Sequence, residues 1–170
     1  MATYAPLFAH VDGWQWRPDM IWYNNLRSFR TTSYYVQQMY SLNKGTNVLS
    51  LTMNGKPVAG NDDQDGLFAS AVFDKEQNNV IVKVVNTGLK EQPIKLNLKG
   101  FKGEHYGAQA VFSASAPYDE NSIDHPMLVV PKFQPLKFTG DAYETTIAPF
   151  TFIMYRINVT EGERLKRQEL

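Results

Sequence analysis

Cysteine is absent from the 170-residue chain, and its absence excludes two kinds of structure. A small fold held together by disulfides needs paired cysteines, and a thiolate zinc site needs cysteine ligands. The three histidines, His10, His105 and His125, are scattered and fit neither an HxH nor an HExxH spacing. No glycine-rich phosphate loop is present either. We therefore expect neither a metal nor a cofactor.

Net charge and long apolar runs are also missing. Seventeen Lys and Arg residues balance seventeen Asp and Glu residues, so no overall field attracts nucleic acid or an anionic membrane. No run approaches the roughly twenty apolar residues of a membrane span, and the N-terminus lacks a basic region followed by an apolar one. We expect no nucleic acid and no membrane among its partners. The compartment stays open, because the signal of a secreted or periplasmic parent protein would lie upstream.

Aromatic side chains are concentrated at the start of the chain. The segment MATYAPLFAHVDGWQWRPDMIWYNN is dense in Trp, Tyr and Phe and opens on an apolar stretch without a leader or linker. Such large side chains need a core, a sugar or a partner protein to cover them. The abrupt start indicates a chain cut out of a larger protein.

One segment has the periodicity of a helix, over Ser33 to Leu42. Thr31-Thr32 can cap its start, and Gly45 is expected to end it in the left-handed conformation. The apolar face repeats at helical spacing and carries Tyr35, Val36, Met39 and Tyr40. The prediction is a short helix with one buried side.

Beyond Gly45 the pattern changes to short β-rich runs separated by turn residues. Apolar and polar residues largely alternate in several of them, which gives each of these strands one solvent-exposed face and one buried face. Asn78-Asn79 favours a tight hairpin, because Asn tolerates positive φ. The fold class is mainly β, an antiparallel sandwich. The predicted strands are Val48 to Met53, Leu67 to Asp74, Val80 to Asn86, Ile94 to Leu98, Ala108 to Ser113, Met127 to Val130, Leu136 to Thr139, Tyr143 to Ile147 and Phe150 to Val159.

Three strings together resemble a known family. They are YAPLF…W.W.PDMIWYNN, then T.SYYVQQMYSLNKGTNVL, and finally DENSIDHP…VVP followed by IAPFTFIMYRI. In order and spacing they resemble the C-terminal region of glycoside hydrolase family 51, the α-L-arabinofuranosidases. The resemblance covers the chain from Tyr4 to Ile157.

The resemblance implies how the chain is organised. In that family a (β/α)8 barrel precedes a β-sandwich of the jelly-roll type. Residues 1–45 would be the end of the barrel, with Ala2 to Ala9 as its last strand, Pro18 to Asn25 as the connection and Ser33 to Leu42 as its final helix. Residues 46–160 would form the sandwich. Residues 161–170 are charged and lack an apolar face, so we expect a disordered tail.

The resemblance also implies an activity for a longer parent. Family members hydrolyse terminal, non-reducing α-L-arabinofuranosyl residues of arabinan and arabinoxylan with retention of configuration. Retention uses two carboxyl groups about 5 Å apart, and in this family both are glutamates of the barrel. Both positions would precede Met1, and no glutamate of this chain lies in a matching motif. We therefore assign no catalytic residue to the chain, expect it to be inactive alone, and expect the barrel of the same polypeptide to be its partner.

Trp14 and Trp16 are the candidate substrate-binding residues, in the intact parent only. With Trp22 they could form a sugar-stacking platform, since indole rings present flat apolar faces. The loop after the eighth barrel strand opens on the active-site face. The alternative, which we favour, is that these rings pack the end of the barrel against the sandwich.

The string Asp119-Glu120-Asn121-Ser122-Ile123-Asp124-His125-Pro126 has two interpretations. Three acids and a histidine suggest a metal site or an acid/base pair. Asn and Asp side chains also bond nearby backbone amides, and Pro126 restricts the residue before it. The second interpretation, a fixed loop, is favoured.

Three functions compete at this point. The first is a sandwich that braces the catalytic barrel of an arabinofuranosidase. The second is a carbohydrate-binding module that binds arabinose-containing glycans through an aromatic surface. The third is self-association through the exposed aromatic strip or an unpaired sheet edge.

Overall fold

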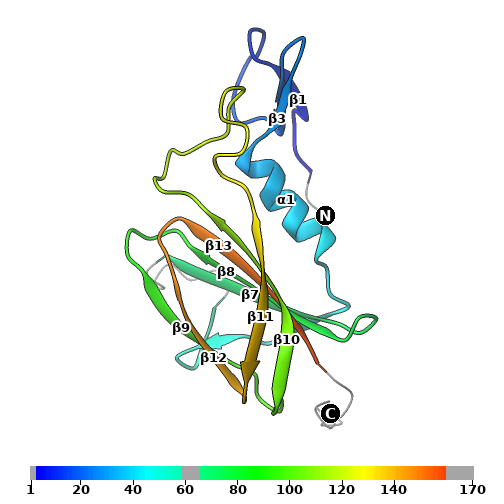
Figure 1. The fold of residues 1–170 in the computed structure, drawn as a ribbon, viewed down its shortest axis with the longest axis vertical. Coiled ribbons are helices and arrows are strands. Elements are labelled where there is room, and N and C mark those ends of the chain that lie inside the picture. The colour runs from blue at the N-terminus through cyan, green and yellow to red at the C-terminus, as the bar shows by residue number, and fades with distance from the viewer. Residues whose placement is uncertain (1–2, 59–65, 160–170) are drawn as a thin grey trace. The chain divides into compact units, whose positions relative to one another are not determined.

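The computed structural model describes residues 3–58 and 66–159, so the charged tail at 161–170 lies outside the described residues (Figure 1). The chain divides into two compact units. Among the described residues, the first unit consists of 3–43 and 114–131, and the second of 44–58, 66–113 and 132–159. Each unit is described by itself.

The second unit contains a six-stranded antiparallel sheet in the order β11-β10-β13-β8-β7-β4. Two further sheets have two strands each, and Figure 1 shows one of these pairs, β9 and β12, side by side. The strand bounds are β4 Asn47–Leu49, β5 Thr52–Met53, β6 Lys56–Pro57, β7 Leu67–Asp74, β8 Asn79–Asn86, β9 Gln92–Asn97, β10 Glu104–Ser113, β11 Lys132–Thr139, β12 Ala142–Ile147 and β13 Thr151–Asn158.

Alternating side chains of these strands build the core of the second unit. Strand β8 reads NVIVKVVN, and its β-branched residues suit a pleated, buried surface. Every second residue of β8 and β13 enters one hydrophobic cluster, against which side chains of β9 and β12 also pack. A sheet on each side of one apolar layer is a sandwich. The buried members of the cluster include Val80, Val82, Val84, Leu136, Ile147, Ile153, Tyr155 and Ile157.

Asn86, at the end of β8, is the main polar group inside this unit. Its side chain is fully buried, and its Nδ2 donates to the carbonyls of Lys90, Ile147 and Ala148 at 2.8, 3.0 and 3.1 Å. Its Oδ1 accepts from the Gly88 amide at 2.9 Å. The side-chain amide of Asn86 thus bonds backbone groups in the segments that follow β8 and β12, where strand pairing ends. A buried polar side chain is tolerated here because its bonds are made.

The first unit contains a small sheet and a helix. Strand β1 (Phe8–His10) runs parallel to β2 (Ile21–Tyr23), and β2 runs antiparallel to β3 (Ser28–Arg30). Helix α1 covers Thr32–Leu42, and its N-cap residue Thr31 accepts a hydrogen bond from the Tyr34 amide at 3.4 Å. This helix is too short to cross a bilayer, and no other helix occurs in residues 3–58 and 66–159.

The predicted fold class is confirmed. The chain is mainly β, the sheets of its second unit are antiparallel, and in its described part the one helix lies near the N-terminus. Strand β7 has the predicted bounds, and most other predicted strands differ by one to four residues at an end. Asn78 has a φ of 51° in the turn between β7 and β8, as the hairpin signal predicts.

Two predicted strands are wrong. Val48 to Met53 is interrupted and forms the separate strands β4 and β5. Met127 to Val130 forms no strand, because the Asn121 side chain bonds both the N–H and the C=O of Val129. A residue whose backbone groups are taken by a side chain has none left for a sheet.

The predicted end of the helix is also wrong. Gly45 does not have a positive φ, and the helix ends at Asn43, whose Nδ2 donates to the Met39 carbonyl at 2.8 Å. The reason for a glycine at position 45 is instead steric, because a Cβ there would lie 2.5 Å from the Cβ of Val72 and clash with it. On the helix, Tyr35 and Met39 are buried, whereas Tyr40 is 45% exposed, so the buried face is narrower than predicted.

Substitutions at two glycines test how closely the backbones of the neighbouring strands β10 and β13 approach each other at Gly107. A Cβ at Gly107 would lie 1.9 Å from the carbonyl oxygen of Arg156, whereas a Cβ at Gly140 meets nothing within 4 Å and is opposed only by its φ of 99°. We predict that Gly107→Ala lowers the free energy of unfolding by about 3 kcal/mol and Gly140→Ala by about 1 kcal/mol. Urea denaturation followed by circular dichroism measures both. Equal losses would contradict the described packing.

Candidate functional site

The three tryptophans of the first unit differ in exposure. Trp22 lies on β2 and is 5% exposed, whereas Trp14 and Trp16 lie in the loop between β1 and β2 and are 47% and 53% exposed. The rings of Trp14 and Trp22 meet edge to face, with centroids 5.9 Å apart. The predicted platform is therefore not one flat surface. Trp22 packs in the interior, and the other two rings remain open to a ligand.

Arg17 joins the indoles to an acidic side chain. Its guanidinium carbon lies 5.2 Å from the Trp14 ring centroid and 5.1 Å from that of Trp22. Both distances are within the range of cation–π attraction. Its Nη1 donates to Oε1 of Glu120 at 3.1 Å. Arg17 thus binds two rings and one carboxylate at the same time.

Glu120 belongs to residues 114–131, which connect β10 to β11 and are held by side-chain bonds to backbone. Asn121 is 3% exposed, and its Nδ2 donates to the carbonyls of Arg30 and Val129, both at 2.9 Å. Its Oδ1 accepts from the Val129 amide at 2.7 Å. Asp119 accepts from the amides of Ser115 and Ala116 at 2.8 and 2.9 Å. The fixed-loop interpretation is confirmed.

Two of the acids of this connection, Glu120 and Asp124, are paired with arginines. Glu120 binds Arg17, and Oδ1 of Asp124 lies 3.8 Å from Nη2 of Arg27, whose Nη1 also donates to the Ile123 carbonyl at 3.4 Å. Across residues 3–58 and 66–159, no group of three or more His, Asp or Glu side chains could hold a metal ion.

A hollow of about 370 Å³ lies beside Arg17 within the first unit. Its lining combines an indole, a guanidinium, hydroxyls and amides, which is a mixture suited to a polyhydroxylated ligand. Because both of its acids are ion-paired, the hollow suits binding rather than acid/base chemistry. Its lining includes Arg17, Trp22, Asn24, Thr32, Ser33 and Glu120.

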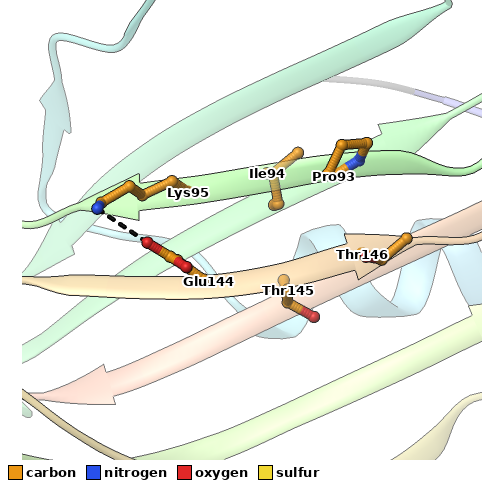
Figure 2. Close-up of a pocket in the computed structure, with 6 residues that line it drawn as sticks. All are labelled: Pro93, Ile94, Lys95, Glu144, Thr145 and Thr146. Carbon is orange, nitrogen blue, oxygen red and sulfur yellow. Dashed lines mark ion pairs between the residues drawn. The ribbon is translucent and has the colours of Figure 1, made fainter.

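A second hollow, of about 480 Å³, lies on β9 and β12 of the second unit (Figure 2). Its charged groups are Lys95 and Glu144, which stand opposite each other across the strands with Nζ and Oε1 2.8 Å apart. Their mutual hydrogen bond and charge attraction lower the pKa of Glu144 and raise the pKa of Lys95. Both groups therefore remain charged near neutral pH, so neither exchanges a proton there. We interpret this pair as a cross-strand contact on a solvated face.

Asp19 is a buried acid of the first unit. It is 1% exposed, and neither of its carboxylate oxygens has a hydrogen-bond partner among the described residues. Burial of a charge without a partner opposes folding strongly.

Comparison with known proteins places this chain in a family. The sequence profile described as "Alpha-L-arabinofuranosidase C-terminal domain" matches residues 1–150. Alpha-L-arabinofuranosidase 2 of Arabidopsis thaliana is 31% identical over 169 residues, which are 97% of this chain and 24% of that protein. Alpha-L-arabinofuranosidase A of Aspergillus niger is 34% identical over 135 residues, which are 77% of this chain and 19% of that protein.

Solved structures show the same fold. The arabinose-bound α-L-arabinofuranosidase MgGH51 superposes with a TM-score of 0.80 at 24% identity, covering 92% of this chain and 24% of that one. The arabinose complex of the α-L-arabinofuranosidase from Thermotoga maritima gives 0.68 at 15% identity, covering 83% of this chain and 32% of that one.

The chain belongs to the C-terminal domain family of the α-L-arabinofuranosidases, and the resemblance to glycoside hydrolase family 51 is confirmed. The chain spans about a quarter of the length of the Arabidopsis relative.

The sequence pointed to Trp14 and Trp16 but missed the residues around them. Arg17 is adjacent to Trp16, yet its partner Glu120 is 103 positions away. The sequence indicates that Asn121 belongs to a fixed loop, but it gives no sign of the bond from Asn121 to Arg30. The sequence thus indicates the tryptophans and the loop separately, but not the long-range contacts that join them.

Two asparagines test the fixed loop. Asn121→Ala would leave three backbone groups without their partner, so we predict a loss of about 2 to 3 kcal/mol in the free energy of unfolding. Asn24 accepts from two exposed amides, and Asn24→Ala should cost below about 1 kcal/mol. All three tryptophans lie in the first unit, so tryptophan fluorescence in urea follows its unfolding. A smaller loss at Asn121 than at Asn24 would contradict this description.

A second variant tests the buried carboxylate. Asp19→Asn replaces a buried carboxyl group, whose oxygens have no hydrogen-bond partner within the described residues, with an amide, so we predict that the isolated chain gains about 1 kcal/mol or more. Asp12→Asn is the control, because the Asp12 side chain is 85% exposed and should leave stability unchanged. Thermal unfolding measures both. Destabilisation by Asp19→Asn would show that the carboxylate is satisfied.

Proposed function

We propose that this chain is the C-terminal part of a retaining α-L-arabinofuranosidase. The whole enzyme would hydrolyse terminal, non-reducing α-L-arabinofuranosyl residues of arabinan or arabinoxylan. The observation that carries the proposal is the family match over residues 1–150, together with relatives about four times as long as the chain. The second unit would brace a catalytic barrel in the same polypeptide. Both catalytic glutamates would lie in that barrel.

The state of the acidic side chains supports a bracing role. A retaining glycosidase needs two carboxyl groups about 5 Å apart, one of them able to donate a proton. In the hollows, Glu120, Asp124 and Glu144 each face a base. Outside them, Glu104 bonds Tyr106 and Lys137, and these contacts lower its pKa. The lowered pKa values of Glu104 and Glu144 make these two carboxylates poor proton donors near neutral pH.

The proposed organisation keeps residues 1–45 as the end of the barrel and 46–160 as the sandwich. The division into compact units between Asn43 and Lys44 supports a boundary near this position. Residues 114–131 group with the N-terminal unit although they connect two strands of the sandwich. We propose that this connection belongs functionally to the barrel side.

We further propose that Trp14 and Trp16 contact substrate in the intact enzyme. Their exposure and their place in the loop after β1 support this role. A free-standing carbohydrate-binding module is the alternative. It is less well supported, because Arg17 lies over Trp14 and the Trp14 ring meets the Trp22 ring edge to face, so that these two rings do not form one flat surface.

The test compares two proteins. We predict that the isolated chain, folded by circular dichroism, does not hydrolyse p-nitrophenyl α-L-arabinofuranoside, and that the polypeptide carrying the chain with its barrel does. Calorimetry of the isolated chain with arabinan distinguishes the alternative, which requires binding that is lost on Trp14→Ala. Turnover by the isolated chain, or an inactive longer polypeptide, would overturn the proposal.

A further inference from the structure

The contact between Arg17 and Glu120 joins two segments that are far apart in the sequence. Arg17 lies in the loop between β1 and β2, and Glu120 lies in the connection between β10 and β11. The guanidinium stands at nearly equal distances from the Trp14 and Trp22 rings, 5.2 and 5.1 Å. Trp22 is buried and therefore provides a fixed wall, whereas Trp14 is half exposed. The orientation of Trp14 thus depends on Arg17 and on its edge contact with Trp22.

Glu120 is held from both sides along the chain. The residue before it, Asp119, accepts two backbone amides, and the residue after it, Asn121, makes three bonds to backbone groups. Its carboxylate therefore projects from a backbone that is fixed in place. Asp119 and Asn121 therefore fix the position from which the Glu120 carboxylate bonds Arg17.

The contact adds little to stability. The side chains of Arg17 and Glu120 are 55% and 66% exposed, and exposed ion pairs contribute about 0 to 1 kcal/mol. A guanidinium with several fixed N–H donors nevertheless specifies direction, which a lysine ammonium does not. The consequence of this geometry is an oriented indole ring rather than a more stable fold.

We propose that Arg17 and Glu120 are positioning residues, which hold Trp14 in the orientation that binds the arabinose-containing glycan. The connection between β10 and β11 would then help to form the substrate-binding surface on the barrel side. This inference rests on the proposed function, in which Trp14 contacts substrate. Sugar binding by an indole requires the ring face to meet the C–H surface of the sugar, so a rotated ring loses affinity without changing the reacting groups.

The experiment uses the polypeptide that carries both the chain and its barrel, with an arabino-oligosaccharide as substrate. Arg17→Met and Glu120→Gln should each raise KM about five-fold or more and leave kcat within about two-fold, the result expected when binding is lost without loss of chemistry. Arg17→Lys keeps the positive charge but loses the planar set of N–H donors, and should give a KM between those of the wild type and Arg17→Met.

Arg27→Met is the matched control. Arg27 bonds the same connection, through Asp124 and Ile123, whereas the cation–π contacts with Trp14 and Trp22 in the described residues come from Arg17. Its KM should equal that of the wild type. A general loosening of the connection would raise KM in this variant as well, and that result would overturn the inference.

The outcomes separate the two proposals. If the wild-type polypeptide is active and KM is unchanged in Arg17→Met and Glu120→Gln, the positioning role is wrong and the proposed function stands. If kcat falls with an unchanged KM, the positioning role is also wrong. An inactive wild-type polypeptide overturns both proposals.

Discussion

The pairing of β8 with β13 is the constraint on which the second unit depends. Eight consecutive residue pairs join these strands, from Thr151 opposite Asn86 to Asn158 opposite Asn79. This register places Tyr155 beside Val82, and both enter the same buried cluster. A shift of one residue would turn every side chain of β13 to the opposite face. Burial also raises the pKa of the Tyr155 phenol, with a contribution from Tyr143, so the hydroxyl stays neutral inside the core.

The first unit depends on polar contacts more than on a large core. Asn121 bonds β3 to the connection between β10 and β11, and Arg17 bonds that connection to the tryptophan loop. Side-chain bonds to backbone fix a segment that has no strand or helix of its own. This difference fits the division of labour that we propose. The apolar sandwich would provide support, and a polar, aromatic surface would meet the sugar.

The sequence predicted the strands well where one face is apolar. The bounds predicted for Leu67–Asp74 are those of β7, and Asn78 lies in the turn that follows it. Met127 to Val130 has the same apolar character, yet Pro126 and Pro131 flank it and Asn121 takes the backbone groups of Val129. Periodicity reports where a side chain can be buried, but it does not report which distant group occupies a backbone N–H. For the same reason, Trp14 could be singled out from the sequence, whereas its contact with Arg17 and the bond from Arg17 to Glu120 could not.

A crystal structure of the complete polypeptide with bound arabinose tests the central claim most directly. The account predicts arabinose between two barrel glutamates, with the Trp14 ring within about 4 Å of the sugar or of the glycan residue next to it. It also predicts that the sandwich, residues 46–113 and 132–160, holds no sugar. Arabinose bound on the sandwich, or a catalytic carboxylate contributed by residues 1–170, would contradict the account.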